Sequence, residues 1–187
     1  MLEVRPLALS DLPALEQLFS CDRLARGCWC MWFIIRVKEF HAGGSAANAA
    51  KFKELAAISE QPLGVVAYLD GEAVGWAAVG PRSRYVRAVR TPTMKSIDPS
   101  ESDDVWLVPC FFVRPDCRRQ GIVKSMLAAA VDLARRSNAS AIEGFPASGD
   151  KPSSTDRQVG TERQFESCDF RAVHRPSSKR VIMRLDL

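Results

Sequence analysis

The residues whose types and spacing most clearly suggest a functional site lie between Val105 and Leu127, in the segment VWLVPCFFVRPDCRRQGIVKSML. An apolar, strand-like run passes there into a helical pattern, with Arg118, Arg119 and Gly121 at the junction. The first N–H groups of a helix have no intrahelical acceptor, and the aligned peptide dipoles make that end partly positive. The arginines add fixed positive charge, and a glycine lets a ligand approach the backbone closely. The segment therefore predicts a site for a phosphate or pyrophosphate group.

The junction does not match the common nucleotide-binding loops. The stretch CRRQGIVKS contains neither G-x-x-x-x-G-K-S/T nor G-x-G-x-x-G, and one glycine cannot form either cradle. P-loop enzymes, protein kinases and dinucleotide-dependent dehydrogenases are therefore excluded as explanations of this segment.

The segment instead resembles the signature of the GNAT superfamily, the acyl-CoA-dependent N-acetyltransferases. In that signature a strand ending in V-R-P precedes Q/R-x-x-G-x-G/A, which opens a helix; the matching residues are FFVRP at 111–115 and RRQGIV at 118–123. The stretches GWAAVGPR, AAVDLARRSNASAIEGFP and FESCDFRAVHRPSSKRVIMR extend the similarity to a bacterial branch that also carries CWCM at 28–31. The resemblance covers nearly the whole chain and implies one domain over residues 1–187.

The resemblance implies an α/β fold of the α+β kind, in which helices flank a mixed, twisted sheet of about six or seven strands. The fourth and fifth strands of that fold splay apart and leave a V-shaped slot. A splayed strand accounts for Pro109, which has no N–H and would break a central ladder unless it stands at an edge, a bulge or a divergence. We expect Pro109 to belong to the divergence.

The same resemblance implies acetyl-CoA, or a related acyl-CoA, as co-substrate. Its pantetheine arm would pair with the exposed backbone of the fourth strand, and its pyrophosphate would bind the backbone at the start of the following helix. Val123 departs from the signature, which has glycine or alanine at that position. The expected cofactor-binding residues are Phe111, Phe112, Val113, Arg118, Arg119, Gln120, Gly121, Ile122, Val123 and Lys124.

Acyl transfer needs an uncharged amine about 3 Å from the thioester carbonyl and an N–H donor for the oxyanion. We expect the N–H of Phe111 to be that donor. Leu107 stands where family members often have a glutamate base, so Glu143 is the first candidate for the base and Asp104 the second. A structural role for Glu143, and deprotonation through water or without assistance, remain open alternatives. Phe165 stands where many members have a tyrosine acid.

The acceptor pocket is expected to be apolar and aromatic, as most ligand sites are. The bulky segment 21–60 and the long polar stretch 81–103 favour an enclosed pocket, and hence a primary amine on a small molecule. A protein N-terminus or a lysine is the alternative acceptor, and an inactive domain that only binds CoA is a further alternative. A homodimer is one possible assembly. The candidate pocket residues are Trp29, Trp32, Trp76 and Cys110.

The charge is mildly basic, with a net charge of +4 and a pI near 8.8, which does not favour a duplex-binding surface. Nucleic acid is therefore not expected as a partner. We interpret the four arginines after the GWAAVG stretch as a solvated loop; contacts to an acidic acceptor or to an outer phosphate of the cofactor are the alternative. These arginines are Arg82, Arg84, Arg87 and Arg90.

The six cysteines are too few and too unevenly spread for a disulfide scaffold, so we expect reduced thiols. Cys28 and Cys30 have C-x-C spacing rather than that of the common zinc knuckle, and no second pair follows. No metal is expected, and these cysteines are assigned to the core or to a pocket lining.

The elements that must position the site follow from periodicity. Asp70-Gly71, between two β-rich runs, predicts a hairpin. Apolar residues three and four apart over 119–136 predict an amphipathic helix. The other expected elements are a strand over 2–7, a helix over 46–58, a strand over 105–113, a short strand in ASAIEGFP, a short helix in TERQFESC, and strands in FRAVHR and KRVIMRLDL.

The bulk properties are those of an ordinary globular domain, with 47% apolar and 26% charged residues. No window approaches the roughly 18 consecutive apolar residues of a membrane span, and no basic region precedes an apolar block at the N-terminus. We expect a cytoplasmic protein that does not associate with membranes.

Overall fold

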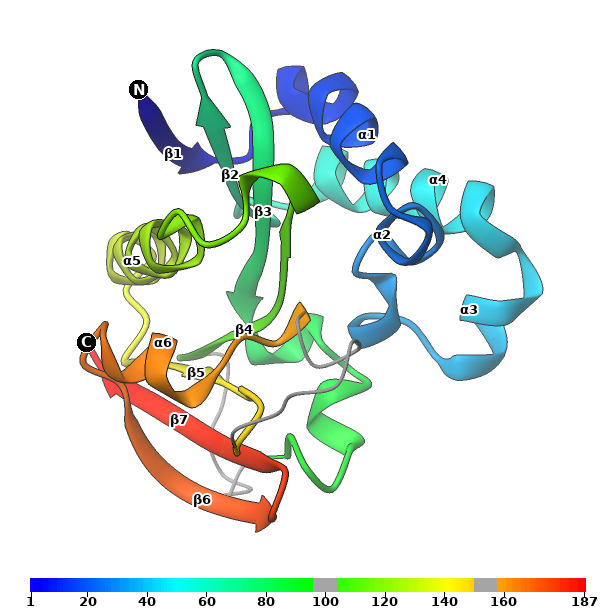
Figure 1. Ribbon diagram of the computed structural model, residues 1–187. Helices are drawn as coiled ribbons and strands as arrows, with labels where there is room; N and C mark the ends of the chain where they lie inside the picture. The colour runs from blue at the N-terminus through cyan, green and yellow to red at the C-terminus, as the bar shows by residue number, and fades with distance from the viewer. Residues whose placement is uncertain (96–103, 150–157) are drawn as a thin grey trace.

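The computed structural model describes residues 1–95, 104–149 and 158–187. These residues form one seven-stranded sheet in the order β1-β2-β3-β4-β5-β7-β6 (Figure 1). Neighbouring strands are antiparallel except β4 and β5, which are parallel. The expected mixed sheet is therefore confirmed. The strands are β1 Leu2–Pro6, β2 Gly64–Leu69, β3 Glu72–Pro81, β4 Val105–Val113, β5 Ala141–Gly144, β6 Arg171–Ser177 and β7 Arg180–Asp186.

Helices cover both faces of the sheet. Helix α5 lies across one face, and α1, α2 and α4 lie on the other (Figure 1). The helices are α1 Leu12–Ser20, α2 Arg23–Cys28, α3 Val37–Ala42, α4 Gly44–Ile58, α5 Ile122–Arg136 and α6 Glu162–Glu166. Short 3-10 turns are η1 Leu9–Asp11, η2 Met31–Phe33, η3 Arg82–Arg84, η4 Ala88–Arg90 and η5 Pro115–Cys117.

Helix α5 has the amphipathic pattern that its sequence predicts. Met126, Leu127 and Ala130 are fully buried against the sheet, whereas Asp132 and Arg135 are exposed. The helix begins at Ile122 rather than near residue 119, because Arg119 and Gly121 have the positive φ angles of 63° and 77°. The residues before Ile122 therefore form a left-handed turn that leads into the helix.

The β2–β3 hairpin turns at Asp70 and Gly71, as predicted. Both residues have positive φ angles, 50° and 87°, which is the geometry of the turn that Asp-Gly favours between antiparallel strands. The hairpin supplies two of the five strands that α5 packs against.

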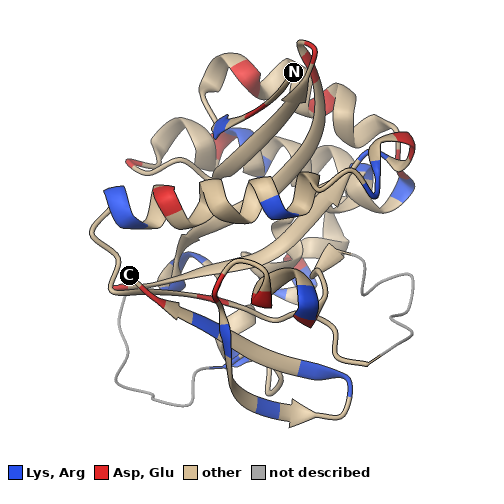
Figure 2. Ribbon diagram, turned by 60° about the vertical axis from the view of Figure 1, so that its left-hand side comes forward, with Lys and Arg blue, Asp and Glu red and all other residues tan. Residues whose placement is uncertain are grey.

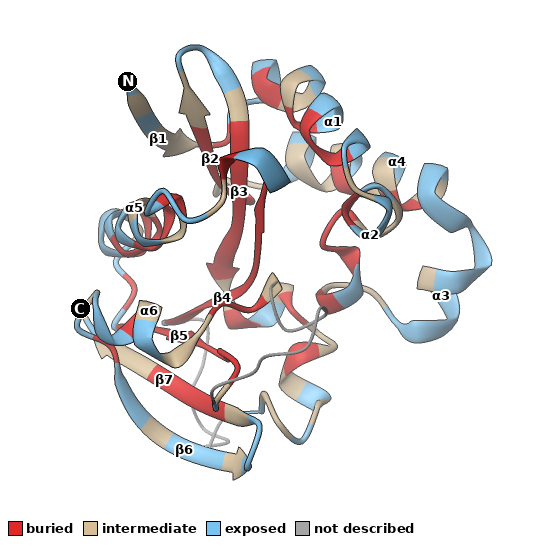
Figure 3. Cartoon of the chain, viewed as in Figure 1, coloured by how far each residue is buried: buried red, intermediate tan, exposed pale blue. Residues whose placement is uncertain are grey.

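The two outer edges of the sheet are formed by β1 and β6. Strand β6 is exposed along most of its length, whereas β2, β3 and β4 are almost continuously buried (Figure 3). Arg175 and Pro176 stand on β6, and its pairing with β7 has two register shifts. Strand β1 ends with Arg5 and Pro6.

None of the helices in the described ranges has both the length and the apolar character that crossing a bilayer requires. Residues 96–103, within the stretch interpreted as a long polar loop, lie outside the described residues.

Gly144, the last residue of β5, allows α6 to pack closely onto the sheet. A Cβ atom at position 144 would lie 2.1 Å from Cε1 of Phe165. We predict that Gly144→Ala lowers the free energy of unfolding by about 1–3 kcal/mol, because the buried ring must move. Urea denaturation measures the change. Gly27→Ala is the matched control: a Cβ there meets nothing within 4 Å, so the variant should be neutral or more stable by up to about 1 kcal/mol.

Candidate active site

The slot of the candidate site opens at Pro109. Strand β4 pairs with β5 only from Val105 to Val108, and its pairing with β3 shifts register at the same place, between Ala78 and Gly80. A proline cannot donate to a ladder, so a bulge on one side and a lost partner on the other accommodate it. The expected divergence at Pro109 is confirmed.

Beyond Pro109, alternate residues of β4 direct their backbone N–H groups into the slot. The N–H of Arg114 donates to the carbonyl of Val74 on β3 at 2.9 Å. In an antiparallel ladder the N–H groups of successive residues point to opposite sides, so Phe112 also faces β3. Phe111 and Val113 therefore face the side from which β5 has diverged.

The principal cavity lies beside this exposed backbone and has a volume of about 440 Å³. It extends from the end of β4 to the first turn of α5, and it is closed by the segment that leads into α6 and by the start of α2. Its lining residues are Asp22, Leu24, Phe111, Phe112, Val113, Cys117, Arg118, Arg119, Gly121, Ile122, Val123, Lys124, Gln158, Gly160, Thr161 and Gln164. Nine of the ten expected cofactor-binding residues are in this set; Gln120 is exposed and does not line the cavity.

The α5 end of the cavity can bind an anion. The first N–H of the helix with an acceptor inside it is that of Ser125, which donates to the Gly121 carbonyl at 3.1 Å. The N–H groups of residues 122–124 precede it in the first turn. Arg119 and Lys124 add positive charge at the cavity wall, and Arg118 Nε donates to the Val113 carbonyl at 3.2 Å. Val123 is accommodated at the wall, although the signature has a smaller residue there.

Sequence reasoning missed the residues that close the cavity from the other side. Thr161 caps α6: its hydroxyl accepts from the Gln164 N–H at 3.4 Å, and Gln164 Oε1 accepts from the Thr161 N–H at 2.8 Å. This T-x-x-Q capping box is visible in the sequence as a helix start. Its position at the cavity, with Gln158 beside it, depends on tertiary structure.

Asp22 is a second site residue that the sequence did not indicate. It caps the six-residue helix α2, where its Oδ1 accepts from the N–H groups of Leu24 at 2.8 Å and Ala25 at 3.0 Å. Among the described residues that line the principal cavity, Asp22 is the one carboxylate.

Phe165 occupies the position of the family's tyrosine as an apolar core residue. It is fully buried, and its ring makes edge contacts with Phe111, with centroids 6.0 Å apart, and with Phe170, at 5.0 Å. Phe165 has no hydroxyl group and cannot act as an acid; its ring instead packs against β4 at the slot.

Glu143 is held by two arginines. Its Oε2 accepts from Arg82 at 2.7 Å and its Oε1 from Arg184 at 3.1 Å, and the Glu143 side chain is only 5% exposed. The three residues join η3, β5 and β7, and Glu143 does not line the cavity. This arrangement favours the structural alternative for Glu143 over its role as the base.

Asp104 lies at the wrong end of β4 to act at the slot. It precedes Val105, and its carbonyl accepts from the N–H of Ser140 at 2.7 Å. Seven residues separate it from Phe111, which is about 23 Å along an extended strand. The expectation that Asp104 is the second candidate for the base is therefore corrected.

The predicted acceptor-pocket residues do not lie together. Trp29 and Trp76 are buried, at 3% and 0% exposure, in an aromatic cluster with Phe19 and Phe52. They form the core between the sheet and the N-terminal helices, so the expectation that they line the pocket is corrected. Trp32 is 37% exposed and lies under Arg87, whose guanidinium carbon is 3.1 Å from the ring centroid.

Three of the four arginines interpreted as a solvated loop have internal partners. Arg82 binds Glu143, Arg84 donates to the carbonyls of Gln61, Pro62 and Val79, and Arg87 stacks on Trp32. Arg90 is exposed. The interpretation as a solvated loop is corrected for these three. Residues of both charges are distributed over many elements of the ribbon (Figure 2).

Cys110 lies on β4 next to Phe111 and lines a small cavity adjacent to the principal one. This second cavity has a volume of about 10 Å³ and shares Phe111, Phe112 and Gln158 with the first. Its other lining residues are Phe19, Ala25, Cys28, Cys30 and Cys110. Within residues 1–95, 104–149 and 158–187, no three His, Cys, Asp or Glu side chains are grouped so as to hold a metal ion.

Comparison with known proteins gives a family match and many structural matches. Residues 29–152 match the family model described as the acetyltransferase (GNAT) family. No curated protein matches the sequence.

Three of the matching solved structures cover the whole of this chain. The ribosomal-protein-S18-alanine N-acetyltransferase of Escherichia coli has 15% identity and a TM-score of 0.53, with 100% of this chain and 94% of that chain covered. The paia N-acetyltransferase of Thermoplasma acidophilum in complex with coenzyme A has 15% identity and a TM-score of 0.54, with 100% and 99% covered. The yncA protein of Salmonella typhimurium with its cofactor acetyl-CoA has 15% identity and a TM-score of 0.58, with 100% and 94% covered. At these identities the likeness concerns the fold.

The Glu143 arrangement gives a prediction that separates a structural role from a catalytic one. Glu143→Gln keeps the shape but removes the charge between two arginines, so the free energy of unfolding should fall by about 3–5 kcal/mol, as when one partner of a buried pair is removed. Chemical denaturation measures it. Glu72→Gln is the control, since Glu72 makes an exposed pair with Arg114 and its loss should cost about 0–1 kcal/mol. An unchanged stability with lost activity would contradict the structural assignment.

Proposed function

The chain belongs to the GNAT acetyltransferase family, and on this premise we propose that it transfers an acetyl group from acetyl-CoA to a primary amine on a small molecule. We propose that residues 1–187 act together as one acyltransferase domain. The six cysteines are all free, which supports action in a reducing, cytoplasmic compartment.

The observation that carries this proposal is the single cavity that joins an open strand edge to a helix start. The exposed backbone of β4 suits an amide-containing arm, and the positive first turn of α5 suits a pyrophosphate. The left-handed conformation of Gly121 leaves open space beside the backbone, where a side chain would otherwise stand. The charge and the hydrogen-bonding capacity of these residues therefore suit coenzyme A.

Each part of the cavity is assigned one role. Phe111 and Val113 would hold the pantetheine arm through their backbone, and residues 119–124 would bind the pyrophosphate, with Arg118 supporting the turn through the Val113 carbonyl. When bound, acetyl-CoA supplies an activated thioester. We propose that the Phe111 N–H stabilises the negative charge that develops on the carbonyl oxygen as an amine attacks.

We propose that Asp22 receives the proton of the attacking amine, directly or through water. It is a carboxylate at the cavity wall, whereas both oxygens of Glu143 accept from arginines and Asp104 lies far along β4. The departing thiolate needs no tyrosine acid in this proposal, because a thiol of pKa about 8.5 is a tolerable leaving group near neutral pH.

A small-molecule acceptor is supported by the closure of the cavity. Residues between Gln158 and Gln164 line one side of the cavity, and Asp22 and Leu24 at the start of α2 line the other. The stacked pair of Trp32 and Arg87 is the proposed outer contact for the acceptor, since its indole is partly exposed.

The first prediction from the proposed function concerns cofactor binding at the left-handed turn. Alanine in the left-handed conformation of Gly121 costs about 1–2 kcal/mol, so the free turn of Gly121→Ala should relax and regain that conformation only on binding; CoA affinity measured by calorimetry should therefore fall about 5- to 30-fold. Gly71→Ala is the matched control: its φ of 87° imposes the same kind of strain in the β2–β3 turn, away from the cavity. Equal losses of affinity in the two variants would contradict the assigned phosphate site.

The second prediction concerns Asp22. Asp22→Asn keeps a good helix cap, and hence the bonds to Leu24 and Ala25, but removes the proton acceptor. With an amine substrate, kcat should fall about 10² to 10⁴-fold while the affinity for acetyl-CoA is retained. Asp132→Asn, on the exposed face of α5, is the control. Tight binding of acetyl-CoA by the natural protein with no acetylation of a broad amine panel would favour an inactive CoA-binding domain instead.

A further inference from the structure

The second, small cavity lies where a chain laid along the slot would end. The anion site at the start of α5 is beside Val113, and Phe111 is two residues farther along β4 towards Pro109. A ligand that begins at the anion site and follows the strand edge therefore passes Val113, then Phe111, and reaches Cys110. The small cavity opens there, on the face of β4 that α1 and α2 cover.

Three cysteine side chains from two distant segments form the floor of this cavity. Cys28 and Cys30 come from the end of α2 and the turn after it, and Cys110 comes from β4. Ala25, Phe19 and Phe112 form the remaining apolar walls. The lining is thus made of thiol, methyl and aromatic groups, with Gln158 at the side shared with the principal cavity.

We infer that this cysteine-floored cavity is the acyl-end pocket, and that it admits an acetyl group and excludes longer acyl chains. The inference rests on the proposed function and adds the acyl-group specificity of the same site. It assigns to Cys28, Cys30 and Cys110 the role of a size limit.

The volume supports this limit. About 10 Å³ is roughly the space of one water-sized group, which corresponds to the methyl group of an acetyl unit. A butyryl chain would need to displace the floor. When a pocket cannot expand, one additional methylene typically lowers the preference for a substrate about 10- to 200-fold.

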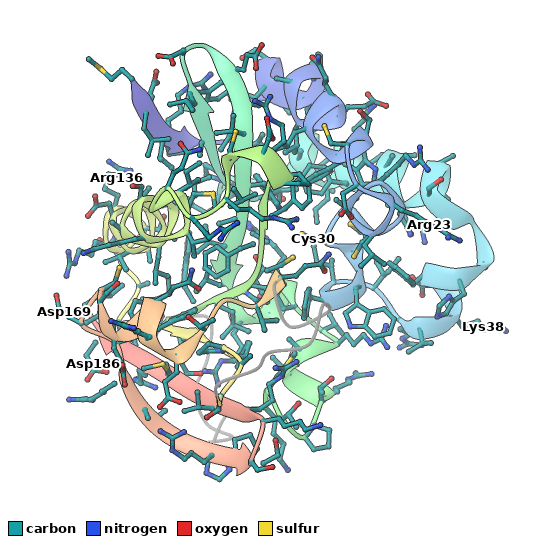
Figure 4. The ribbon with its side chains drawn as sticks, viewed as in Figure 1. Arg23, Cys30, Lys38, Arg136, Asp169 and Asp186 are labelled. Carbon is teal, nitrogen blue, oxygen red and sulfur yellow. The ribbon has the colours of Figure 1, made fainter. Side chains whose placement is uncertain are left out.

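The floor is held in a conformation that resists displacement. Trp29 and Cys30 both have positive φ angles, 50° and 53°, which non-glycine residues rarely adopt and which persist only where the surroundings enforce them. Trp76 Nε1 donates to Cys30 Sγ at 3.3 Å, and the buried Asn48 donates to the Gly27 carbonyl at 2.9 Å. In Figure 4 Cys30 lies on the inner side of this turn, whereas Arg23 and Lys38 lie on the outer side.

The protonation state of the thiols suits a passive lining. Burial, with the nearby Cys30, raises the pKa of Cys28 to about 12, and the hydrogen bond with Cys30 together with burial raises the pKa of Cys110 well above its usual value. Both therefore stay protonated at neutral pH, and a thiol is a far weaker nucleophile than a thiolate. The floor can contact an acyl group without accepting it.

The inference is tested first on the natural protein by calorimetry with CoA, acetyl-CoA and butyryl-CoA. The expected result is that butyryl-CoA binds at least about tenfold more weakly than acetyl-CoA, because its two extra methylenes have no space. Equal affinity for the two acyl-CoAs would overturn the inference and leave the proposed function intact. Absence of binding by CoA itself would overturn both.

Two variants change the pocket in opposite directions. Cys28→Ala combined with Cys110→Ala deepens it, so the preference for acetyl-CoA over butyryl-CoA should shrink several-fold. Ala25→Leu fills it, so acetyl-CoA should bind more weakly than free CoA. Cys21→Ala, an exposed cysteine outside both cavities, should change neither ratio. With CoA affinity retained, the assignment of these residues would be overturned by an unchanged acetyl-to-butyryl ratio in the double cysteine variant, or by an unchanged ratio of acetyl-CoA to CoA affinity in Ala25→Leu.

Discussion

Pro109 has no N–H to donate, and the arrangement of the site depends on this one missing donor. Strand β4 keeps its parallel partner only up to Val108, and its pairing with β3 shifts register at the same point. Beyond it, the N–H groups of Phe111 and Val113 face the slot, where Arg118 binds the Val113 carbonyl. Because α5 begins close to the free end of the strand, the unpaired edge runs directly to a helix start. The strand edge and the anion site are thus parts of one continuous path.

Where β4 and β5 are still paired, before they diverge, the ion pairs of Glu143 stabilise the sheet. Arg82 and Arg184 hold this carboxylate from η3 and β7, on the strand that pairs with the first half of β4. Phe165 fills the space next to Gly144 where β5 ends, and its ring contacts Phe111. Phe165, at the position where the resemblance implied a tyrosine acid, therefore supports the wall of the slot.

The sequence was informative wherever a local pattern determines the structure. The Asp70-Gly71 turn, the amphipathic face of α5 and the single glycine before it depend on neighbours within a few residues. It was less informative where partners are distant. Arg82 binds a carboxylate that lies 61 positions away in the sequence. Trp76 and Trp29 pack into the core, but a tryptophan is equally common in a ligand pocket, so the residue type alone does not distinguish the two. Gln158 and Asp22 reach the cavity only through the folded chain, so no nearby residue could have indicated them.

The outer edges of the sheet bear on where this protein can accept a further hydrogen-bonded strand. Strand β6 carries Arg175 and Pro176 and is bent by two register shifts, and β1 is five residues long and ends with Pro6. Prolines, charges, irregular pairing and short length are all features that prevent edge-to-edge aggregation. Among the described strands, the apolar stretch that lacks a strand partner on one side is therefore internal, on β4. The edge strands β1 and β6 of this sheet therefore resist pairing with another strand, whereas the backbone of β4, in the middle of the sheet, can pair with an extended ligand.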